Sequence, residues 1–360
     1  MVIKKVFSAG VDYIQVLDEN GKADKALEKE LVKDGLKREH LIALYRYMVT
    51  ARVLDEKAIN LQRQGRLLTY APCKGEEAIS VGTSFALNKD DWVVPSYREQ
   101  GMYVTRGVPL KYFMMYFMGF EEGNHLPDEF NITPVCVPVA THFPHAAGIG
   151  IALRYKGENK VVMTYTGDGG TSEGDFYEAI NFAGVYNAPV VFVIRNNQWA
   201  ISVPRKKQTA AKTIAQKGIA AGINCMQADG NDVLAMYYTA KKAVERARKG
   251  DGPTLIEAVS YRMSMHTTAD DPKRYMPEEE IEAWKKKDPI ERFRKYLKAK
   301  RILNEALEKR ILKQANTDVE HAVEEAEAFR TDYTHMFKSV YERIPAELEE
   351  QMEEAGRFAR

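Results

Sequence analysis

Continuous apolar runs alternate with amphipathic stretches through the central part of the chain. The runs at residues 161–166 and 190–194 are rich in apolar residues, which predicts strands that are covered on both faces, and residues 254–261 predict a further strand. Between the first two runs, apolar residues recur at helical spacing from Phe176 onward, and residues 232–249 predict another helix. Strands that alternate with helices favour a mainly parallel sheet flanked by helices, which is an α/β fold.

The chain on both sides of this region is predicted to be largely helical. Residues 36–64 carry apolar side chains at helical spacing, and residues 307–329 have the pattern of a long amphipathic helix. Asp288 and Pro289 have the order of a helix N-cap followed by a proline in the first turn. The chain therefore divides into an N-terminal arm (1–36), an α/β domain (37–276) and a helical C-terminal extension that packs on the core and on a subunit interface (277–360).

The composition argues against some classes of partner. The chain has 360 residues, and its 52 basic and 51 acidic residues leave a net charge of +1. A balance this close to zero gives no reason to expect binding to nucleic acid or to a membrane surface. No segment has the roughly 20 apolar residues of a membrane span. The 3 cysteines lie far apart and the N-terminus does not resemble a secretory signal, so we expect a cytoplasmic protein.

Polar residues follow two of the predicted strands. Gly167-Asp168-Gly169 comes directly after the first strand, and Asn196-Asn197 comes directly after the second. Right-handed crossovers place the ends of successive parallel strands on one edge of a sheet, where ligands of such folds bind. One turn, one helix and one strand separate the two motifs and return the chain to that edge. We therefore expect the side chains of Asp168 and Asn197 to meet there.

The turn after the first strand has features that suit a phosphate. Its glycines let the backbone approach a ligand closely. Ser172, followed three residues later by Asp175, resembles a capping box that would start the next helix, and a helix N-terminus offers free N–H groups to an anion. Mg²⁺ prefers oxygen ligands and is usually held by one or two protein oxygens together with phosphates. The oxygens of Asp168 and Asn197 beside this turn predict a site for magnesium diphosphate.

These motifs belong to longer segments that resemble the thiamine-diphosphate motif, which opens with GDG and ends with NN. The segments are GDGGTSEGDFYEAINFAGVYNAPVVFVIRNNQWAIS (167–202), ADGNDVLAMY (228–237), YRMSMHTTADDPKRY (261–275), SYREQG (96–101) and VATHFPHAAG (139–148). The chain resembles most closely the α subunits of the decarboxylase component of branched-chain and pyruvate dehydrogenase complexes. This resemblance covers roughly residues 40–345 and implies the thiamine-diphosphate-binding fold.

The resemblance also implies roles for individual residues. Asp168, Asn197 and the backbone carbonyl of Trp199 would bind Mg²⁺. His266 would act in catalysis at the reactive end of the cofactor, and His142 would help hold the substrate carboxylate or the cofactor. The residues that would contact thiamine diphosphate are Tyr97, Arg98, Val137, Val139, Asp168, Gly169, Gly170, Arg195, Asn197 and His266.

Simpler interpretations of some of these residues stay open at the level of sequence. Arg98 and Arg195 could form surface ion pairs, as most arginines do. His266 could be an ordinary histidine of a polar loop. His142 and His145 could form a metal pair, although no third ligand is evident.

The resemblance implies a reaction and two partner proteins. The reaction is the oxidative decarboxylation of a 2-oxoacid with reductive acylation of a lipoyl group on a partner acyltransferase. Enzymes of this type need a glutamate that activates the aminopyrimidine ring, and single-chain relatives carry it in a second α/β domain. The segment after Tyr275 offers no second sheet, so we expect a separate β subunit in an α₂β₂ heterotetramer. The segments RNNQWAIS, SEGD and ADGND slightly favour a branched-chain substrate over pyruvate.

Other functions share some of these features. An acetoin dehydrogenase α subunit has the same cofactor motif. A nicotinamide oxidoreductase would need GxGxxG at the start of a helix after the first strand, and the chain lacks that motif. A scaffold protein could use the charged C-terminal helices to bind partners, although such helices more often cover a core or an interface.

Overall fold

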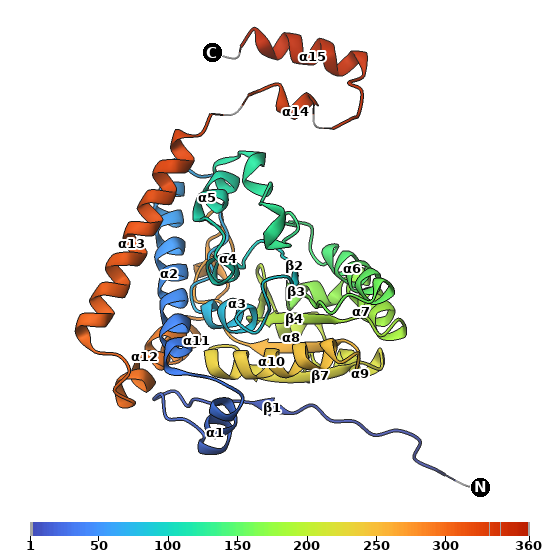
Figure 1. Cartoon of the computed structure of the whole chain (residues 1–360), viewed down its shortest axis with the longest axis vertical. Coiled ribbons are helices and arrows are strands. Elements are labelled where there is room, and N and C mark those ends of the chain that lie inside the picture. Colours follow the sequence, from blue (N-terminus) through green and yellow to red (C-terminus); the bar gives the residue numbers. More distant parts are fainter. Residues whose placement is uncertain (1–2, 331, 339, 359–360) are drawn as a thin grey trace.

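Six parallel strands form the centre of the protein (Figure 1). The computed structural model describes residues 3–330, 332–338 and 340–358. The strands are β1 (Tyr13–Ile14), β2 (Trp92–Val94), β3 (Val162–Gly167), β4 (Val190–Asn196), β5 (Trp199–Ala200), β6 (Val203–Pro204), β7 (Asn224–Asp229) and β8 (Thr254–Val259). The main sheet has the order β1-β7-β8-β4-β3-β2 with parallel neighbours, while β5 and β6 form a separate antiparallel hairpin. The predicted α/β fold with a mainly parallel sheet is thereby confirmed.

Helices surround this sheet and extend from it at the C-terminal end (Figure 1). The α-helices are α1 (Lys25–Lys33), α2 (Arg38–Arg63), α3 (Glu77–Ser84), α4 (Gln100–Arg106), α5 (Leu110–Met118), α6 (His142–Lys156), α7 (Gly174–Val185), α8 (Arg205–Gln208), α9 (Gln216–Ala220), α10 (Val233–Arg248), α11 (Glu278–Lys285), α12 (Pro289–Ala299), α13 (Glu305–Ala328), α14 (His335–Lys338) and α15 (Ala346–Gly356). Short 3₁₀ turns are η1 (Glu121–Asn124), η2 (Asp128–Phe130), η3 (Gly169–Ser172) and η4 (Pro272–Arg274).

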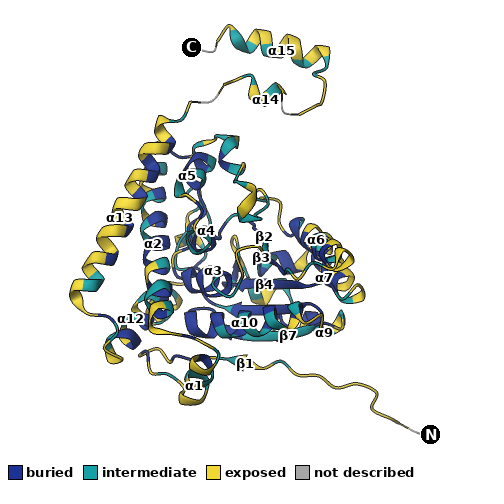
Figure 2. Ribbon diagram, viewed as in Figure 1, coloured by how far each residue is buried: buried dark blue, intermediate teal, exposed yellow. Residues whose placement is uncertain are grey.

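The sheet has a hydrophobic core on each face, as the apolar runs predicted. Met163 and Tyr165 of β3 point to one face, where the core includes α10, α3, α4 and α2. Val162 of the same strand points to the other face, where α6 and α7 complete the core. Every residue of β4 is buried. Figure 2 shows the buried strands between helices whose outer surfaces are exposed. A parallel sheet covered in this way explains why its strands lack polar alternation.

One of the two predicted helix starts is confirmed and the other is wrong. Asp288 caps α12 by accepting from the backbone N–H groups of Ile290 and Glu291, as predicted. The capping box proposed for Ser172 and Asp175 is wrong, because Ser172 is the last residue of η3 and α7 begins at Gly174. The chain tightens into a 3₁₀ turn after β3, so the helix begins later than the capping pattern predicted.

The N-terminal arm contributes a strand that the sequence pattern did not reveal. Tyr13 and Ile14 pair in parallel with β7 at the edge of the sheet. After Gln15, Val16 and Leu17 are buried, and both donate backbone hydrogen bonds to Asp232 at the start of α10, at 2.7 and 2.5 Å. A two-residue strand has no periodicity to recognise, which is why the sequence pattern predicted only an arm for residues 1–36.

The C-terminal extension has a packed part and an outlying part. Helix α13 packs along α2 and α5, and α12 packs against α2 and α3. Helices α14 and α15 lie beyond the end of α13, away from the sheet (Figure 1). Among the helices of the described part of the chain, none combines the length and the apolar character that crossing a bilayer requires. The boundaries at residues 36 and 276 and the subunit interface stay predictions.

Candidate active site

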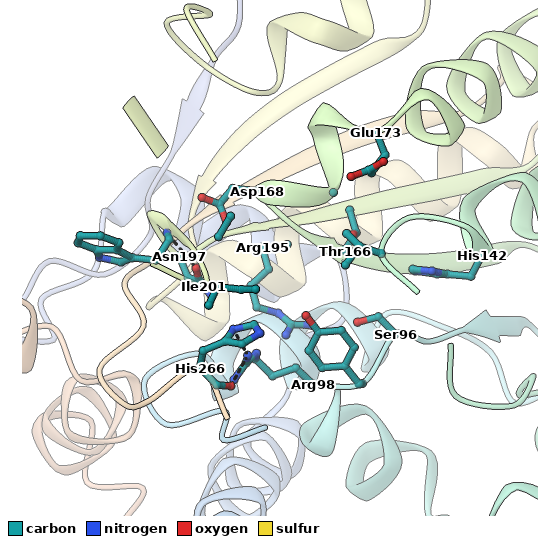
Figure 3. A pocket seen from close by; sticks show the side chains of 17 residues that line it. Ser96, Arg98, His142, Thr166, Asp168, Glu173, Arg195, Asn197, Ile201 and His266 are labelled. Atoms are coloured by element: carbon teal, nitrogen blue, oxygen red, sulfur yellow. Dashed lines mark hydrogen bonds between the residues drawn. The ribbon is translucent and has the colours of Figure 1, made fainter. Parts of the chain in front are cut away.

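The ends of β3 and β4 open into one cavity (Figure 3). The two strands are paired with Gly167 opposite Arg195, so Asp168 and Asn197 follow their strands at the same edge of the sheet. Both residues line a cavity of about 210 Å³. The structure therefore places both residues at one cavity on the same edge of the sheet.

The cavity brings together most of the residues that the sequence singled out. Those that line it are Tyr97, Arg98, Val139, His142, Asp168, Gly169, Gly170, Arg195, Asn197, Trp199 and His266. Val137 does not line it, and its side chain is 55% exposed. The remaining lining residues are Ser96, Thr166, Gly167, Glu173, Ala200 and Ile201.

Asp168 is a buried carboxylate with one weak side-chain partner. The residue is only 2% exposed, and the amide of Gln208 reaches Oδ2 at 3.4 Å, near the limit of a hydrogen bond. Backbone N–H groups of Asp168 and Gly169, in its own turn, also favour the charged carboxylate. Burial raises the pKa of Asp168 to about 7, and the nearby charge of Glu76 adds to this increase. A cation beside Asp168 would offset the cost of this desolvated charge.

The turn after Asp168 leaves no space for side chains. A Cβ atom on Gly169 would lie 2.7 Å from Cβ of Ala200, and one on Gly170 would collide with the hydroxyl of Thr166. The same absence of side chains lets a ligand approach the backbone of the turn. This close packing explains the glycines and places the turn directly against the hairpin that contains Trp199.

Asn197 is held by contacts at both ends of its amide. Its Nδ2 donates to the two carboxylate oxygens of Glu76 at 3.1 and 3.2 Å. Its Oδ1 accepts from the backbone N–H of Trp199 at 3.2 Å. The carbonyl oxygen of Trp199 lies 3.5 Å from Nη1 of Arg262. Asp168, Asn197 and the Trp199 carbonyl together offer a carboxylate, an amide and a backbone oxygen, which suits a hard cation such as Mg²⁺.

Arg98 and Arg195 are buried, so the interpretation as surface ion pairs is wrong for both. They are 4% and 3% exposed. Arg195 forms an ion pair with Glu99, and its Nε lies 3.4 Å from Glu76. Arg98 donates to the carbonyls of Pro72 and His266, the second at 2.9 Å. Their guanidinium groups place positive charge at the cavity wall, where a diphosphate would require it.

His266 is surrounded by two cationic donors. Nη2 of Arg98 lies 3.2 Å from its Nδ1, and Nη1 of Arg262 lies 3.4 Å from the same atom. A guanidinium group can only donate, so Nδ1 is the acceptor and the proton of the neutral ring is on Nε2. Burial and the two arginines lower the pKa of His266 to about 4. The imidazole is therefore uncharged near neutral pH and acts as a hydrogen-bond donor through Nε2.

The loop that carries His266 is fixed by its own side chains. Asp270 accepts from the backbone N–H of His266 at 2.7 Å and from the hydroxyl of Tyr275 at 2.5 Å. Arg262 donates to the same hydroxyl at 2.6 Å. Thr268 donates its backbone N–H to the carbonyl of Tyr70 at 2.8 Å. These hydrogen bonds fix the conformation of the loop, so His266 is not an ordinary histidine of a polar surface loop.

His142 is buried at the cavity wall and faces the backbone of β3. Its Nε2 lies 2.5 Å from the carbonyl oxygen of Tyr165, and burial lowers its pKa. Since that carbonyl can only accept, Nε2 carries the proton and Nδ1 is left as an acceptor. Nδ1 is itself buried and has no hydrogen-bond partner among the described residues, and the role expected for His142 in holding the substrate carboxylate or the cofactor stays a prediction. His145 is exposed on the same helix, which does not suit a metal pair with His142.

The structure adds three residues that the sequence did not single out. Glu76 contacts Asn197, Glu99 pairs with Arg195, and Arg262 contacts both His266 and the Trp199 carbonyl. Glu99 and Arg262 lie within the quoted segments SYREQG and YRMSMHTTADDPKRY, so their motifs were noticed without their roles. Glu76 lies outside every quoted segment, and only tertiary contact reveals it.

Comparisons with known proteins give a consistent result. A family model described as dehydrogenase E1 component matches residues 45–333. The chain is 44% identical over 344 residues to the pyruvate dehydrogenase E1 component subunit alpha of Staphylococcus aureus, which covers 95% of this chain and 92% of that relative. It is 43% identical over 344 residues to the protein of the same name from Staphylococcus epidermidis, with the same shares covered.

Proposed function

This chain belongs to the dehydrogenase E1 component family, and from that membership we propose that it is the α subunit of a thiamine-diphosphate- and magnesium-dependent decarboxylase in a 2-oxoacid dehydrogenase complex. One observation carries the proposal. Asp168 and Asn197, which follow neighbouring strands, line the same cavity as two buried arginines and a histidine. Asp168 and Asn197 suit a metal, the two arginines suit a diphosphate, and the histidine suits an oxygen that gains charge in the reaction.

The residues present fit magnesium diphosphate. Asp168, Asn197 and the carbonyl of Trp199 supply oxygen ligands at one side of the cavity. Gly169 and Gly170 would let the backbone approach the diphosphate, and Arg98 and Arg195 would face it with positive charge. Mg²⁺ keeps near-octahedral geometry and commonly shares its ligands between protein and phosphate, so a few protein oxygens suffice.

His266 is the residue of this chain proposed to act on the reacting atoms. Thiamine diphosphate supplies the electron sink for loss of carbon dioxide when it is bound. His266 offers a neutral Nε2–H held in place by Arg98 and Arg262. A positioned donor of this kind stabilises an oxygen that gains negative charge. With a pKa of about 4, His266 is better suited to that role than to supplying a proton.

Two partner chains follow from this assignment. A cavity of about 210 Å³ is smaller than the roughly 300–1,000 Å³ of most ligand pockets. We propose that it holds the diphosphate end and that a β subunit covers the rest of the cofactor and supplies the activating glutamate, in an α₂β₂ heterotetramer. A lipoyl-bearing acyltransferase would accept the acyl group. The three unpaired cysteines are in keeping with a location in the cytoplasm.

The preferred 2-oxoacid is the finer part of the proposal. The relatives quoted above are named for pyruvate, so the branched-chain preference drawn from short segments finds no support in them. We propose pyruvate as the first substrate to test, with branched-chain 2-oxoacids second. An acetoin dehydrogenase α subunit is the alternative, since it shares the cofactor motif.

The test is to co-express this chain with its β subunit and to assay the purified complex with Mg²⁺ and thiamine diphosphate. Pyruvate, branched-chain 2-oxoacids and acetoin are compared for transfer to a lipoyl domain. We expect turnover with a 2-oxoacid, loss of turnover after chelation of Mg²⁺, and none from the α chain alone. Robust turnover by the α chain alone would remove the β subunit from the proposal, and preference for acetoin would replace the reaction.

A further inference from the structure

We propose that Glu76 is a positioning residue that holds the amide of Asn197 with its oxygen toward the metal side of the cavity. The inference rests on the proposed function, because it concerns how this chain prepares one of the Mg²⁺ ligands. Glu76 is 2% exposed and is not itself among the residues that line the cavity. It acts through Asn197 and has no assigned contact with the metal.

The contacts of the Asn197 amide agree with only one orientation. Both carboxylate oxygens of Glu76 lie on the Nδ2 side, at 3.1 and 3.2 Å. The backbone N–H of Trp199 lies on the Oδ1 side, at 3.2 Å. A rotated amide would place its oxygen against two carboxylate oxygens and its NH₂ group against an N–H donor. The rotated amide would then make an acceptor–acceptor contact with Glu76 and a donor–donor contact with Trp199, and both contacts are unfavourable.

This orientation matters because only the oxygen of an amide binds a hard cation. Asn197 presents either Oδ1 or Nδ2 to its surroundings, and the two atoms differ little in size. With Glu76 engaged on Nδ2, Oδ1 accepts from the backbone N–H of Trp199 and keeps a second lone pair for the cavity, where the carboxylate of Asp168 also lies (Figure 3). Partners of this kind, which orient a metal ligand, typically change metal affinity about 10- to 100-fold when they are removed.

Glu76 is itself held rigidly enough to serve as a support. Its carboxylate does not cap helix α3, although Glu76 occupies the N-cap position of that helix. Its backbone N–H donates to the carbonyl of Cys73 at 2.9 Å, and the carbonyl of Gly75 accepts from Asn231 at 2.9 Å. Arg195 faces the carboxylate from the other side, with Nε 3.4 Å from Oε2. The backbone of Glu76 is therefore fixed in a hydrogen-bonded turn, and its carboxylate reaches the amide of Asn197.

The negative charge of Glu76 can strengthen cation binding by itself, so the test must separate this electrostatic effect from the positioning of Asn197. Glu76 is close enough to Asp168 to act on it electrostatically, and any buried carboxylate near a cation would strengthen binding. Glu99 provides a matched control, because it is also buried and also pairs with Arg195 but has no contact with Asn197 among the described residues. The substitution Glu76→Asp shortens the side chain by one methylene, so it keeps the charge but removes the contact with Asn197.

The experiment measures Mg²⁺ affinity by calorimetry for the complex of this chain with its β subunit and thiamine diphosphate at fixed pH. We expect Glu76→Asp, which retains the charge, to weaken Mg²⁺ binding about tenfold. Glu76→Gln should weaken it at least as much, because Arg195 favours the Gln oxygen and the Gln NH₂ then faces Nδ2 of Asn197. Glu99→Gln, which removes a charge and keeps the contact, should change it less than about threefold.

Each outcome decides between positioning and charge. Affinities of Glu76→Asp within about twofold of wild type would overturn the inference. Equal losses in Glu76→Gln and Glu99→Gln, with none in Glu76→Asp, would assign the effect to charge alone and overturn it as well. If wild type itself binds no Mg²⁺ with thiamine diphosphate, the proposed function fails first. Thermal unfolding of each variant confirms that folded complexes are compared.

Discussion

Two strands of the same sheet end in acidic turns that serve different purposes. Asp168 follows β3 in the turn Gly167-Asp168-Gly169, and Asp229 ends β7 at the start of the turn that leads to Asp232. Asp168 lines the cavity. Asp229 and Asp232 instead bind Arg292 and the N-terminal arm, and together with Arg292 we call them the closed acidic cluster.

Protein atoms satisfy the acids of the closed acidic cluster. Arg292 donates to Asp229 at 2.8 Å, and Gln15 donates to the same carboxylate at 2.9 Å. Asp232 accepts from the backbone of the arm, at Val16 and Leu17, while capping α10. The cluster thus joins the arm, the sheet and the C-terminal extension at one point.

The difference shows what separates a structural carboxylate from a functional one. Burial raises the pKa of both Asp168 and Asp232, to about 7 and about 6, so a shifted pKa does not distinguish them. Their partners do. Asp232 accepts from backbone N–H groups of the distant N-terminal arm as well as of its own helix, whereas the backbone donors to Asp168 belong to its own turn and its side-chain contact with Gln208 is long. A buried carboxylate that faces a cavity indicates a ligand, while one enclosed by donors indicates a fold contact.

The largest expected effect comes from removing the charge that faces the cavity. Asp168→Asn keeps the shape and should lower turnover about 100- to 1,000-fold, because a charged Mg²⁺ ligand is lost. The free energy of unfolding should change by less than about 1 kcal/mol, since a desolvated charge disappears. Steady-state kinetics, Mg²⁺ titration and urea unfolding test this. Unchanged Mg²⁺ affinity would remove Asp168 from the metal site.

The opposite pattern is expected on breaking the closed acidic cluster. Arg292→Met leaves buried carboxylates without their cation and should destabilise the fold by about 3–5 kcal/mol. Mg²⁺ affinity of the folded protein should be unchanged. Arg294→Met is the control on the same helix, because Arg294 is partly exposed and its pairs with Glu291 and Glu308 should contribute no more than about 1 kcal/mol. Equal losses in the two variants would contradict the comparison.

The pH dependence of stability sharpens the contrast. The folded-state pKa of Asp232 is about 6, above its ordinary value of 3.8. Its contribution to stability is therefore fully present below about pH 4 and is lost as the pH rises through 6. Relative to Asp232→Asn, which does not titrate, wild type should lose about 2–3 kcal/mol between pH 4 and 7.5. Urea unfolding of both proteins at several pH values measures this, and a constant difference would refute it.

The smallest expected effect compares the glycines of the two turns. A Cβ on Gly169 would lie 2.7 Å from Ala200, and one on Gly230 would lie 2.9 Å from the carbonyl oxygen of Val259. Alanine at either position should therefore cost roughly 1–2 kcal/mol of stability. Only Gly169→Ala should also weaken binding of magnesium thiamine diphosphate, about tenfold, which corresponds to about 1.4 kcal/mol. A similar loss of affinity in Gly230→Ala would show that the two turns are not separate.

Much of the candidate site was predictable because its signals are local. The apolar runs gave the strands, and GDG and NN followed two strands that a single crossover connects. The edge strand β1, the 3₁₀ turn η3 and the contact between Glu76 and Asn197 were not predictable. A two-residue strand has no period, a 3₁₀ turn has no distinct sequence pattern here, and the Glu76 contact joins residues far apart in the chain.

The sequence alone determined the parallel sheet and the pair of polar residues at its edge, because hydrophobic periodicity and residue chemistry act over short spans of chain. It did not determine which acidic turn would stay open, since Asp168 and Asp229 both follow or end a strand beside a glycine. Only the tertiary structure decided that, by bringing Arg292 and the arm to one turn and leaving the other facing a cavity. The physical reason is that the partners of a buried charge come from elements distant in sequence.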